Sequence, residues 1–124
     1  MSALKLEKLD RDFTVCKLPE NAAPDRKCSF FFMAKTEEEF SLVCPTEETP
    51  PDTIAREDGW KAFRVQGQLD FSLTGILAKI AGILAESEIP IFVVSTYNTD
   101  YILVKQENFE KAVEVLSSKG YVII

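Results

Sequence analysis

The residues best suited to chemistry lie in one short segment, where Ser72 and Thr74 precede Gly75 and the apolar pattern of a helix begins. A strand is predicted just before this segment, over residues 63–68, so the chain passes from strand to helix through a short polar turn. The first backbone N–H groups of a helix have no partners within it and lie at the positive end of its dipole. We therefore expect a small anion, such as a carboxylate or a phosphate, to bind at this turn.

Local structure alone offers a second explanation of the same turn. Ser72 is predicted to be the N-cap of the helix, and serine and aspartate are favoured at helix starts with or without a ligand. Gly75 needs a further reason, because glycine in the first turn of a helix costs up to about 1 kcal/mol relative to alanine. Either a ligand atom close to the backbone or a close contact between helix and sheet would supply it.

The composition argues against an enzyme. The chain has 124 residues and no histidine, which excludes Ser-His and Cys-His nucleophiles and removes the commonest general base and metal ligand. Its three cysteines form no CxxC motif and are expected to be buried or half-buried thiols. Three adjacent acidic residues, Glu37, Glu38 and Glu39, cannot converge on one ion and are expected at a solvated hairpin tip. We therefore expect no catalytic residue, no metal site and no cofactor.

Charge and hydropathy narrow the class of partner. The net charge is -6 and the basic residues are scattered, so neither a nucleic acid nor an anionic membrane is an expected partner. No apolar run reaches the roughly 18 residues of a membrane span, and residues 1–9 lack the apolar centre of a secretory signal. The expected location is the cytoplasm.

The C-terminal half shows the clearest order of elements. A helix is predicted over residues 73–87, strands over residues 91–97 and 100–105, a second helix over residues 107–118, and a last strand over residues 121–124. Together with the strand over residues 63–68, these elements follow the order βαββαβ. This order predicts a four-stranded antiparallel sheet with both helices on one face, which is the ferredoxin-like arrangement.

The N-terminal half repeats the C-terminal half at an offset of 61 positions. Glu39-Phe40 then matches Asp100-Tyr101, and Gly59-Trp60 matches Gly120-Tyr121. The repeat predicts a hairpin from residues 29–35 and 40–44, a short helix near residues 52–57 and a strand from Trp60.

The start of the N-terminal half contains no counterpart of the first helix of the C-terminal half. Residues 13–18 are predicted as its first strand, with residues 4–9 as a candidate partner, whereas residues 19–27 contain two prolines and are too short for a helix. We therefore predict a degenerate module over residues 1–61 and a complete one over residues 62–124. A single long strand bent at Gly67 could serve both modules.

Two segments of the complete module resemble a known family. Residues 70–77 read Asp-Phe-Ser-Leu-Thr-Gly-Ile-Leu, and residues 94–101 read Val-Ser-Thr-Tyr-Asn-Thr-Asp-Tyr. They resemble the ACT domain, and more narrowly the aspartate-kinase-like ACT family, which includes cytosolic arginine sensors and small stand-alone bacterial proteins. The resemblance implies an α+β fold of two tandem ferredoxin-like ACT modules, with antiparallel sheets and helices on one face, the first module lacking its first helix.

The resemblance also implies a function. It implies a non-enzymatic regulatory protein that binds an amino acid at an interface between modules or subunits, forms a homodimer and has a regulated enzyme as a partner. Carried over by position, the backbone N–H groups of residues 72–75 would bind the α-carboxylate, and the hairpin residues Thr96, Tyr97 and Asp100 would face the ammonium group or the side chain. The implied ligand-binding residues are Asp70, Ser72, Leu73, Thr74, Gly75, Thr96, Tyr97 and Asp100.

Two other interpretations stay open. Asp100 follows a turn, where a solvated aspartate is common, so the pocket could be vestigial and the protein a structural or interaction module. In that case the small residues Gly75, Ala78, Gly82 and Ala85 would let another helix or subunit approach closely. A catalytic ferredoxin-like domain with Asp70 or Asp100 as general base is disfavoured, because no histidine and no second charged group is placed beside them by a motif.

Overall fold

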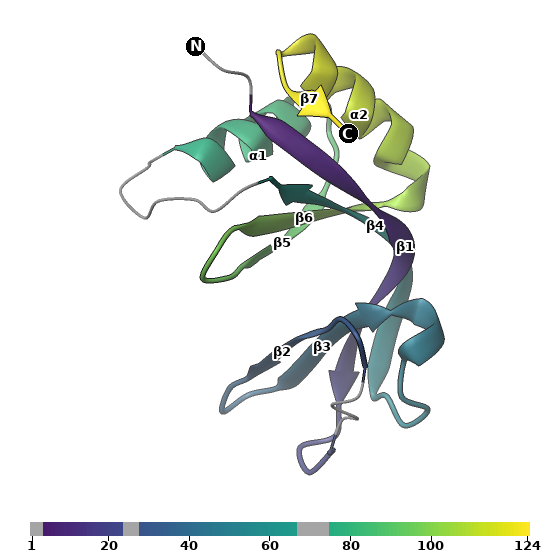
Figure 1. Ribbon diagram of the computed structural model, residues 1–124. Helices are drawn as coiled ribbons and strands as arrows, with labels where there is room; N and C mark the ends of the chain where they lie inside the picture. The colour runs from purple at the N-terminus through teal and green to yellow at the C-terminus, as the bar shows by residue number, and fades with distance from the viewer. Residues whose placement is uncertain (1–3, 24–27, 67–74) are drawn as a thin grey trace. The chain divides into compact units, whose positions relative to one another are not determined.

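The computed structural model describes residues 4–23, 28–66 and 75–124 (Figure 1). The chain divides into two compact units, here called the N-terminal unit, Arg11–Trp60, and the C-terminal unit, Lys61–Ile124 together with the chain up to Asp10. Two long strands, β1 (Lys5–Leu18) and β4 (Ala55–Val65), each contribute to both units. That the two units correspond to ACT-like modules over residues 1–61 and 62–124 stays a prediction.

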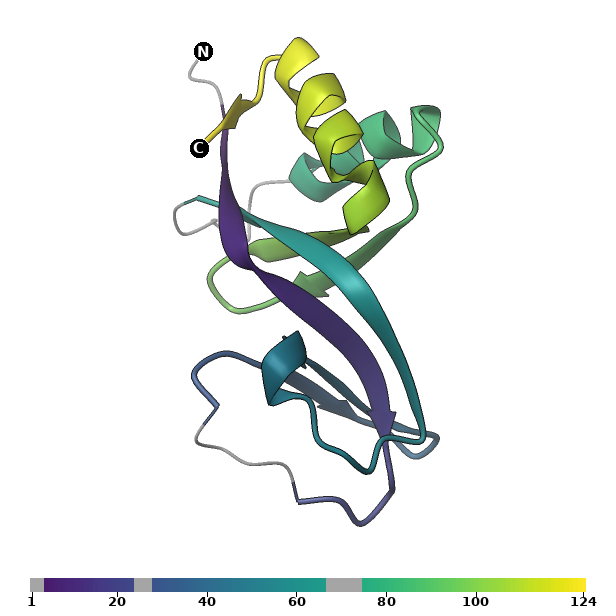
Figure 2. The ribbon, with the colours of Figure 1, turned by 90° about the vertical axis from the view of Figure 1, so that its right-hand side faces the viewer.

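The C-terminal unit has the predicted α+β composition. Its remaining elements are α1 (Ile76–Glu86), β5 (Ile91–Ser95), β6 (Asp100–Lys105), the 3-10 turn η2 (Gln106–Asn108), α2 (Phe109–Ser118) and β7 (Val122–Ile123). The strand order in this unit is β7-β1-β4-β6-β5. Both helices lie on the same face of these strands (Figures 1 and 2). The ferredoxin-like fold with helices on one face is therefore confirmed.

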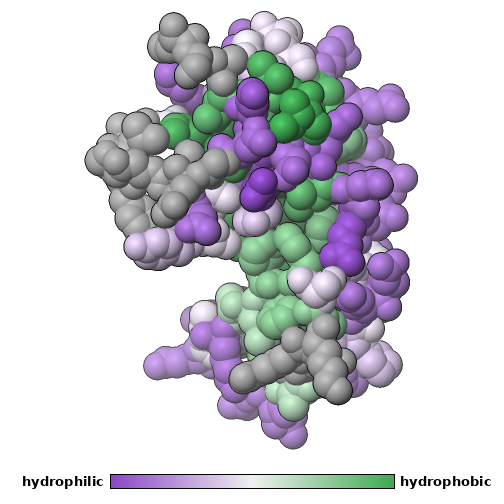
Figure 3. All heavy atoms as spheres, in the orientation of Figure 1, coloured by the Kyte–Doolittle hydropathy of each residue, from purple (hydrophilic) through white to green (hydrophobic). Residues whose placement is uncertain are grey.

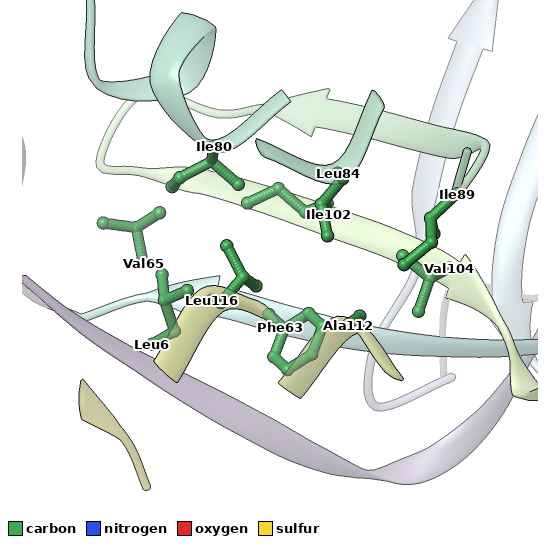
Figure 4. Close-up of a cluster of buried hydrophobic side chains, with 10 residues drawn as sticks. All are labelled: Leu6, Phe63, Val65, Ile80, Leu84, Ile89, Ile102, Val104, Ala112 and Leu116. Carbon is green, nitrogen blue, oxygen red and sulfur yellow. The ribbon is translucent and has the colours of Figure 1, made fainter. Parts of the chain in front are cut away.

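The core of this unit lies between the helices and the sheet. Every second residue of a strand points to the same face, so Phe63 and Val65 of β4 face the helices together with Ile102 and Val104 of β6 (Figure 4). From the helices, the fully buried side chains are Ile80, Leu84, Ala112 and Leu116. The ring of Phe109 stacks on that of Phe63, with centroids 4.9 Å apart. Helical periodicity in the sequence therefore predicted the buried faces of both helices correctly.

The start of α1 differs from the prediction. The helix begins at Ile76 rather than at residue 73, and its N-cap is Gly75, which has φ 80° and ψ -2°. The predicted N-cap Ser72 is therefore wrong, and that residue lies outside the described ranges. A left-handed backbone is strained for any residue with a Cβ, so the position of the helix start follows from the glycine.

The last strand also takes a different place from the predicted one. β7 pairs with β1 in parallel, Lys5 opposite Val122 and Leu6 opposite Ile123, and it is β1 that lies beside β4. Residues 5–9 and 13–18 belong to one continuous strand, so the predicted pairing of residues 4–9 with residues 13–18 is wrong. Leu6 explains this order, because its fully buried side chain belongs to the same core as Phe63 and Leu116. Burying that leucine requires the strand to lie under the helices.

The N-terminal unit consists of strands and one 3-10 turn among its described residues. Besides β1 and β4, it contains β2 (Phe32–Lys35), β3 (Phe40–Pro45) and η1 (Thr46–Glu48), in the strand order β2-β3-β1-β4. The predicted β2–β3 hairpin is confirmed, with a shorter first strand. The predicted helix near residues 52–57 is wrong, because Ala55 already belongs to β4.

The internal repeat has an offset of 60, not 61, from the hairpin to the 3-10 turn. Lys35 pairs with Phe40 and Ser95 pairs with Asp100, so each member of the second pair lies 60 positions beyond the first. The predicted match of Glu39 with Asp100 is therefore wrong by one residue. Side chains alternate between the two faces of a strand, and only the offset of 60 matches the buried Leu42 with the buried Ile102, each in the core of its own unit.

Candidate functional site

The elements that carry the described part of the predicted site lie at one end of the C-terminal unit. The end of β4, the start of α1 and the turn between β5 and β6 all lie at this end (Figures 1 and 2). Of the predicted site residues, the structure describes Gly75, Thr96, Tyr97 and Asp100, whereas Asp70, Ser72, Leu73 and Thr74 lie outside the described ranges.

A buried hydroxyl joins two of these elements. Thr99 in the β5–β6 turn is 5% exposed, and its Oγ1 donates a hydrogen bond of 2.7 Å to the carbonyl oxygen of Val65. Val65 is the last residue of β4 and is fully buried. The bond therefore holds the hairpin turn at the point where the chain leaves the sheet toward α1. The sequence marked Thr99 only as a turn residue, because nothing in a local pattern indicates a partner 34 positions away.

Thr96 closes the same turn. Its Oγ1 donates to the carbonyl oxygen of Thr99 at 2.9 Å and accepts from the backbone N–H of Thr99 at 3.3 Å. A hydroxyl has one proton and two lone pairs, so one lone pair of this oxygen is left for another donor. If Thr96 contacts a ligand, it can only accept a hydrogen bond, as from an ammonium group.

Asp100 and Tyr97 lie on this hairpin with different surroundings. Asp100 is half-buried, begins β6 and lies two residues before Ile102, so its side chain lies on the face that the helices cover. Tyr97 is 76% exposed at the tip of the turn. The hairpin therefore brings a hydroxyl acceptor and a carboxylate to the end of the sheet where α1 begins.

The backbone conformation at position 75 explains the glycine there, and close packing does not. Its φ of 80° is left-handed, and a Cβ at this position would meet no heavy atom of the described residues within 4 Å. The first hydrogen bond of the helix runs from the N–H of Lys79 to the carbonyl of Gly75, at 2.9 Å. The N–H groups without partners inside the helix are therefore those of its first residues, Ile76, Leu77 and Ala78, which come later than the predicted set.

The three thiols lie in the N-terminal unit, and burial makes Cys16 and Cys44 unsuited to nucleophilic chemistry. Cys16 and Cys44 are buried and Cys28 is half-buried, as was predicted. Burial, with a smaller contribution from Cys44, raises the pKa of Cys16 to about 11, and burial raises the pKa of Cys44 despite its hydrogen bond with Thr49. In the described ranges, no three residues of the histidine, cysteine, aspartate or glutamate type come together as metal ligands.

The β2–β3 turn of the N-terminal unit corresponds to the β5–β6 turn in the repeat, and a hollow lies beside it. A hollow of about 200 Å³ lies where the end of β1 meets the β2–β3 turn, lined by Leu18, Thr36 and Phe40 among others. Hydrophilic side chains gather at the tip of this hairpin (Figure 3). The ammonium group of Lys35 donates to the carbonyl of Glu20 at 3.1 Å and lies 5.2 Å from the centre of the Phe40 ring.

Comparison with known families gives a direct match. The family model of the ACT domain matches residues 55–118. Subunit 1 of the cytosolic arginine sensor for mTORC1 from Homo sapiens is 33% identical over 98 residues, which cover 73% of this chain and 30% of the relative. The same subunit from Mus musculus is 31% identical over 97 residues, covering 73% of this chain and 29% of the relative. The chain thus spans about 30% of the length of these curated relatives.

Solved structures match over the whole chain. Protein Atu0741 from Agobacterium tumefaciens has a TM-score of 0.88 and 29% identity, covering 100% of this chain and 94% of that one. Aspartate kinase from Clostridium acetobutylicum has a TM-score of 0.65 and 17% identity, covering 94% of this chain and 34% of the kinase. At that identity the likeness to the kinase shows the fold alone. In the described ranges, no helix is both long and apolar enough to cross a membrane.

Proposed function

Because this chain belongs to the ACT-domain family, we propose that it is a regulatory protein that binds an amino acid and catalyses no reaction itself. The relatives compared above are named as arginine sensors, and its structural neighbours include an aspartate kinase described as an allosteric enzyme. Amino acid sensing, homodimer formation, control of a partner enzyme and a cytoplasmic location are parts of this proposal.

The observation that carries the proposal is the hydrogen bond from Thr99 to Val65. It holds the β5–β6 turn at the end of β4, beside the start of α1. An amino acid in this place can use both elements, with its α-carboxylate on the N–H groups near Gly75 and its ammonium group on the free lone pair of Thr96 and the carboxylate of Asp100. Asp70, Ser72, Leu73, Thr74 and Tyr97 complete the proposed ligand-binding set.

The proposed ligand lies at an interface, and a second copy of the chain completes it. One end of a single sheet can enclose only part of an amino acid, whereas small-molecule sites usually bury most of the ligand. Binding and self-association should therefore be linked. The amino acid is expected to raise the fraction of dimer, because a ligand that contacts both copies stabilises their contact.

A second candidate is a structural module with a vestigial pocket. It is favoured by the exposed small residues Ala78, Gly82 and Ala85 on α1, where a Cβ on Gly82 would meet no described heavy atom within 4 Å. Another helix could pack there closely.

Thermal shift and calorimetry with the twenty amino acids test the proposal on the full chain. A ligand at one hundred times its Kd should stabilise the fold by about 2.7 kcal/mol. The variant Asp100→Asn should weaken the response, whereas Glu107→Gln, an exposed carboxylate just beyond the same strand, should leave it unchanged. If no amino acid at millimolar concentration raises Tm while a partner protein binds stably, the structural module is the better account.

A further inference from the structure

The strands β1 and β4 belong to both units and are bonded to each other in each of them. In the C-terminal unit, the N–H of Gln66 donates to the carbonyl of Lys5 at 2.9 Å. In the N-terminal unit, the N–H of Ile54, just before β4, donates to the carbonyl of Lys17 at 2.8 Å. One pair of neighbouring strands therefore continues from one unit into the other.

β4 passes from one unit to the other through buried residues. Trp60, the last residue of the N-terminal unit, is 8% exposed, and Ala62 and Phe63, which follow in the C-terminal unit, are 2% and 0% exposed. Segments that join independent domains are usually exposed and polar, and few contacts cross them. Opening β4 at the boundary between the units is unfavourable, because it would bring the apolar surface of these side chains into water.

Hydrogen bonds attach both parts of β4, one at the candidate site and one in the N-terminal unit. At the end of the strand, the carbonyl of Val65 accepts the hydroxyl of Thr99. Earlier in the same strand, Asp58 Oδ1 accepts a bond of 2.6 Å from Thr14 Oγ1, which belongs to β1 and is fully buried. The same hydroxyl lies 3.0 Å from that of Thr46 in η1. A change at the candidate site therefore acts on a strand whose other part is bonded into the N-terminal unit.

We propose that β1 and β4 couple the two units, so that a change in stability at the candidate site changes the opening of the N-terminal unit by the same factor. β1 contributes Leu6 to the core of the C-terminal unit, and Cys16 and Leu18 to that of the N-terminal unit. Loss of either core withdraws support from the strands on which the other core depends. The coupling is a property of the fold, and only its use in amino acid sensing rests on the proposed function. The N-terminal unit then reports the occupancy of a site that the C-terminal unit contains.

Amide hydrogen exchange of the full chain tests this proposal without any ligand. Leu116→Ala removes apolar atoms from the core of the C-terminal unit, and the amides to follow are those of β3, which lies in the N-terminal unit. A buried leucine-to-alanine change raises the opening equilibrium by more than about tenfold, so the β3 amides should exchange at least about tenfold faster. Glu114→Ala, at an exposed position of the same helix, should leave their exchange unchanged.

Two further variants keep the test decisive if Leu116→Ala does not fold. Thr99→Val removes the bond that holds the end of β4 at the candidate site, and it should speed the exchange of the β3 amides about fivefold or more. Leu42→Ala removes apolar atoms from the core of the N-terminal unit, and it should speed the exchange of the α2 amides at least about tenfold. The effect is therefore expected in both directions.

Urea unfolding of the wild-type protein gives an independent measurement. Trp60, the one tryptophan of the chain, belongs to the N-terminal unit and reports on it by fluorescence. Far-ultraviolet circular dichroism reports on α1 and α2, which belong to the C-terminal unit. Coupled units unfold in one transition, so the two midpoints should coincide.

The proposal is overturned if Leu116→Ala or Thr99→Val speeds exchange in the C-terminal unit while the β3 amides keep their wild-type rates. It is also overturned if the two urea midpoints differ, or if Leu42→Ala leaves the α2 amides unaffected. None of these measurements uses an amino acid. Their failure therefore says nothing against amino acid binding, and an amino acid screen without a response says nothing against the coupling.

Discussion

Replacing Thr99 with valine tests whether one buried hydroxyl positions the candidate site. Valine has nearly the same shape as threonine, so the substitution removes the bond of 2.7 Å to the carbonyl of Val65 without opening a cavity. The turn also keeps its backbone bond from the N–H of Thr96 to the carbonyl of Thr99, at 2.8 Å. The change is therefore confined to the link between the hairpin and β4.

The size of the effect follows from burial. Thr99 is 5% exposed and Val65 is fully buried, so water cannot easily replace the lost donor. Losing a buried hydrogen bond and leaving its acceptor unpaired costs about 1–3 kcal/mol, part of which the added methyl group offsets. We expect a loss of about 1–2 kcal/mol in the free energy of unfolding, which for a chain of this length lowers Tm by about 3–10 °C. Amino acid binding should weaken at the same time.

Urea unfolding and amide hydrogen exchange measure the two parts of this prediction. Thr36→Val in the N-terminal unit is the control for removing a hairpin-turn hydroxyl, because the side chain of Thr36 is exposed and its hydroxyl bonds to residues of its own turn. Its cost should be about 0.5 kcal/mol or less. Thr99→Ser retains the hydroxyl and should preserve amide protection in the β5–β6 turn. Equal urea midpoints for Thr99→Val and wild type, or equal loss of protection in Thr99→Ser and Thr99→Val, would refute the reasoning.

The two helix glycines should respond oppositely to alanine: Gly75→Ala should cost about 1–2 kcal/mol because of its φ of 80°, whereas Gly82→Ala should stabilise by about 0.5–1 kcal/mol because its Cβ enters open space inside the helix. Chemical denaturation checks both, and a stabilising Gly75→Ala would contradict the left-handed assignment. Leu116→Ala should cost about 2–5 kcal/mol, because this fully buried side chain belongs to the core between α2 and the sheet; a loss under 1 kcal/mol would show that the core closes around the gap. Burial raises the pKa of Cys16 from 9.0 to about 11, so the unfolded chain releases this proton first and stability should fall between pH 9 and pH 11. Comparing wild type with Cys16→Val by urea unfolding at pH 8 and pH 10.5 checks the sign, and an equal pH dependence of the two proteins would refute it.

The candidate site shows which features a local sequence pattern can predict and which it cannot. The sequence placed a helix after β4 and a turn between β5 and β6, and it selected Thr96 and Asp100 on that turn. It missed Thr99, whose role depends on a carbonyl in another strand. It also placed the helix start too early at Ser72, because capping preferences favour serine without regard to the left-handed glycine that follows.

The repeat shows a similar limit. Glu39 was matched with Asp100 because their side chains are similar. The strand pairing in the two hairpins instead matches Phe40 with Asp100. A strand repeats every two residues, so an error of one position reverses the two faces of a strand. Only the pairing of the strands distinguishes the two offsets.

By itself, the sequence determined the two amphipathic helices, the two hairpins, the order of elements from β4 onward and the absence of histidine chemistry, because each depends on residue types or on contacts between near neighbours. The tertiary structure alone decided that β1 lies between β4 and β7 and that Thr99 binds Val65. These features depend on which strands and loops meet. Alternation along a strand indicates that it has a buried face, but not which other segment buries it.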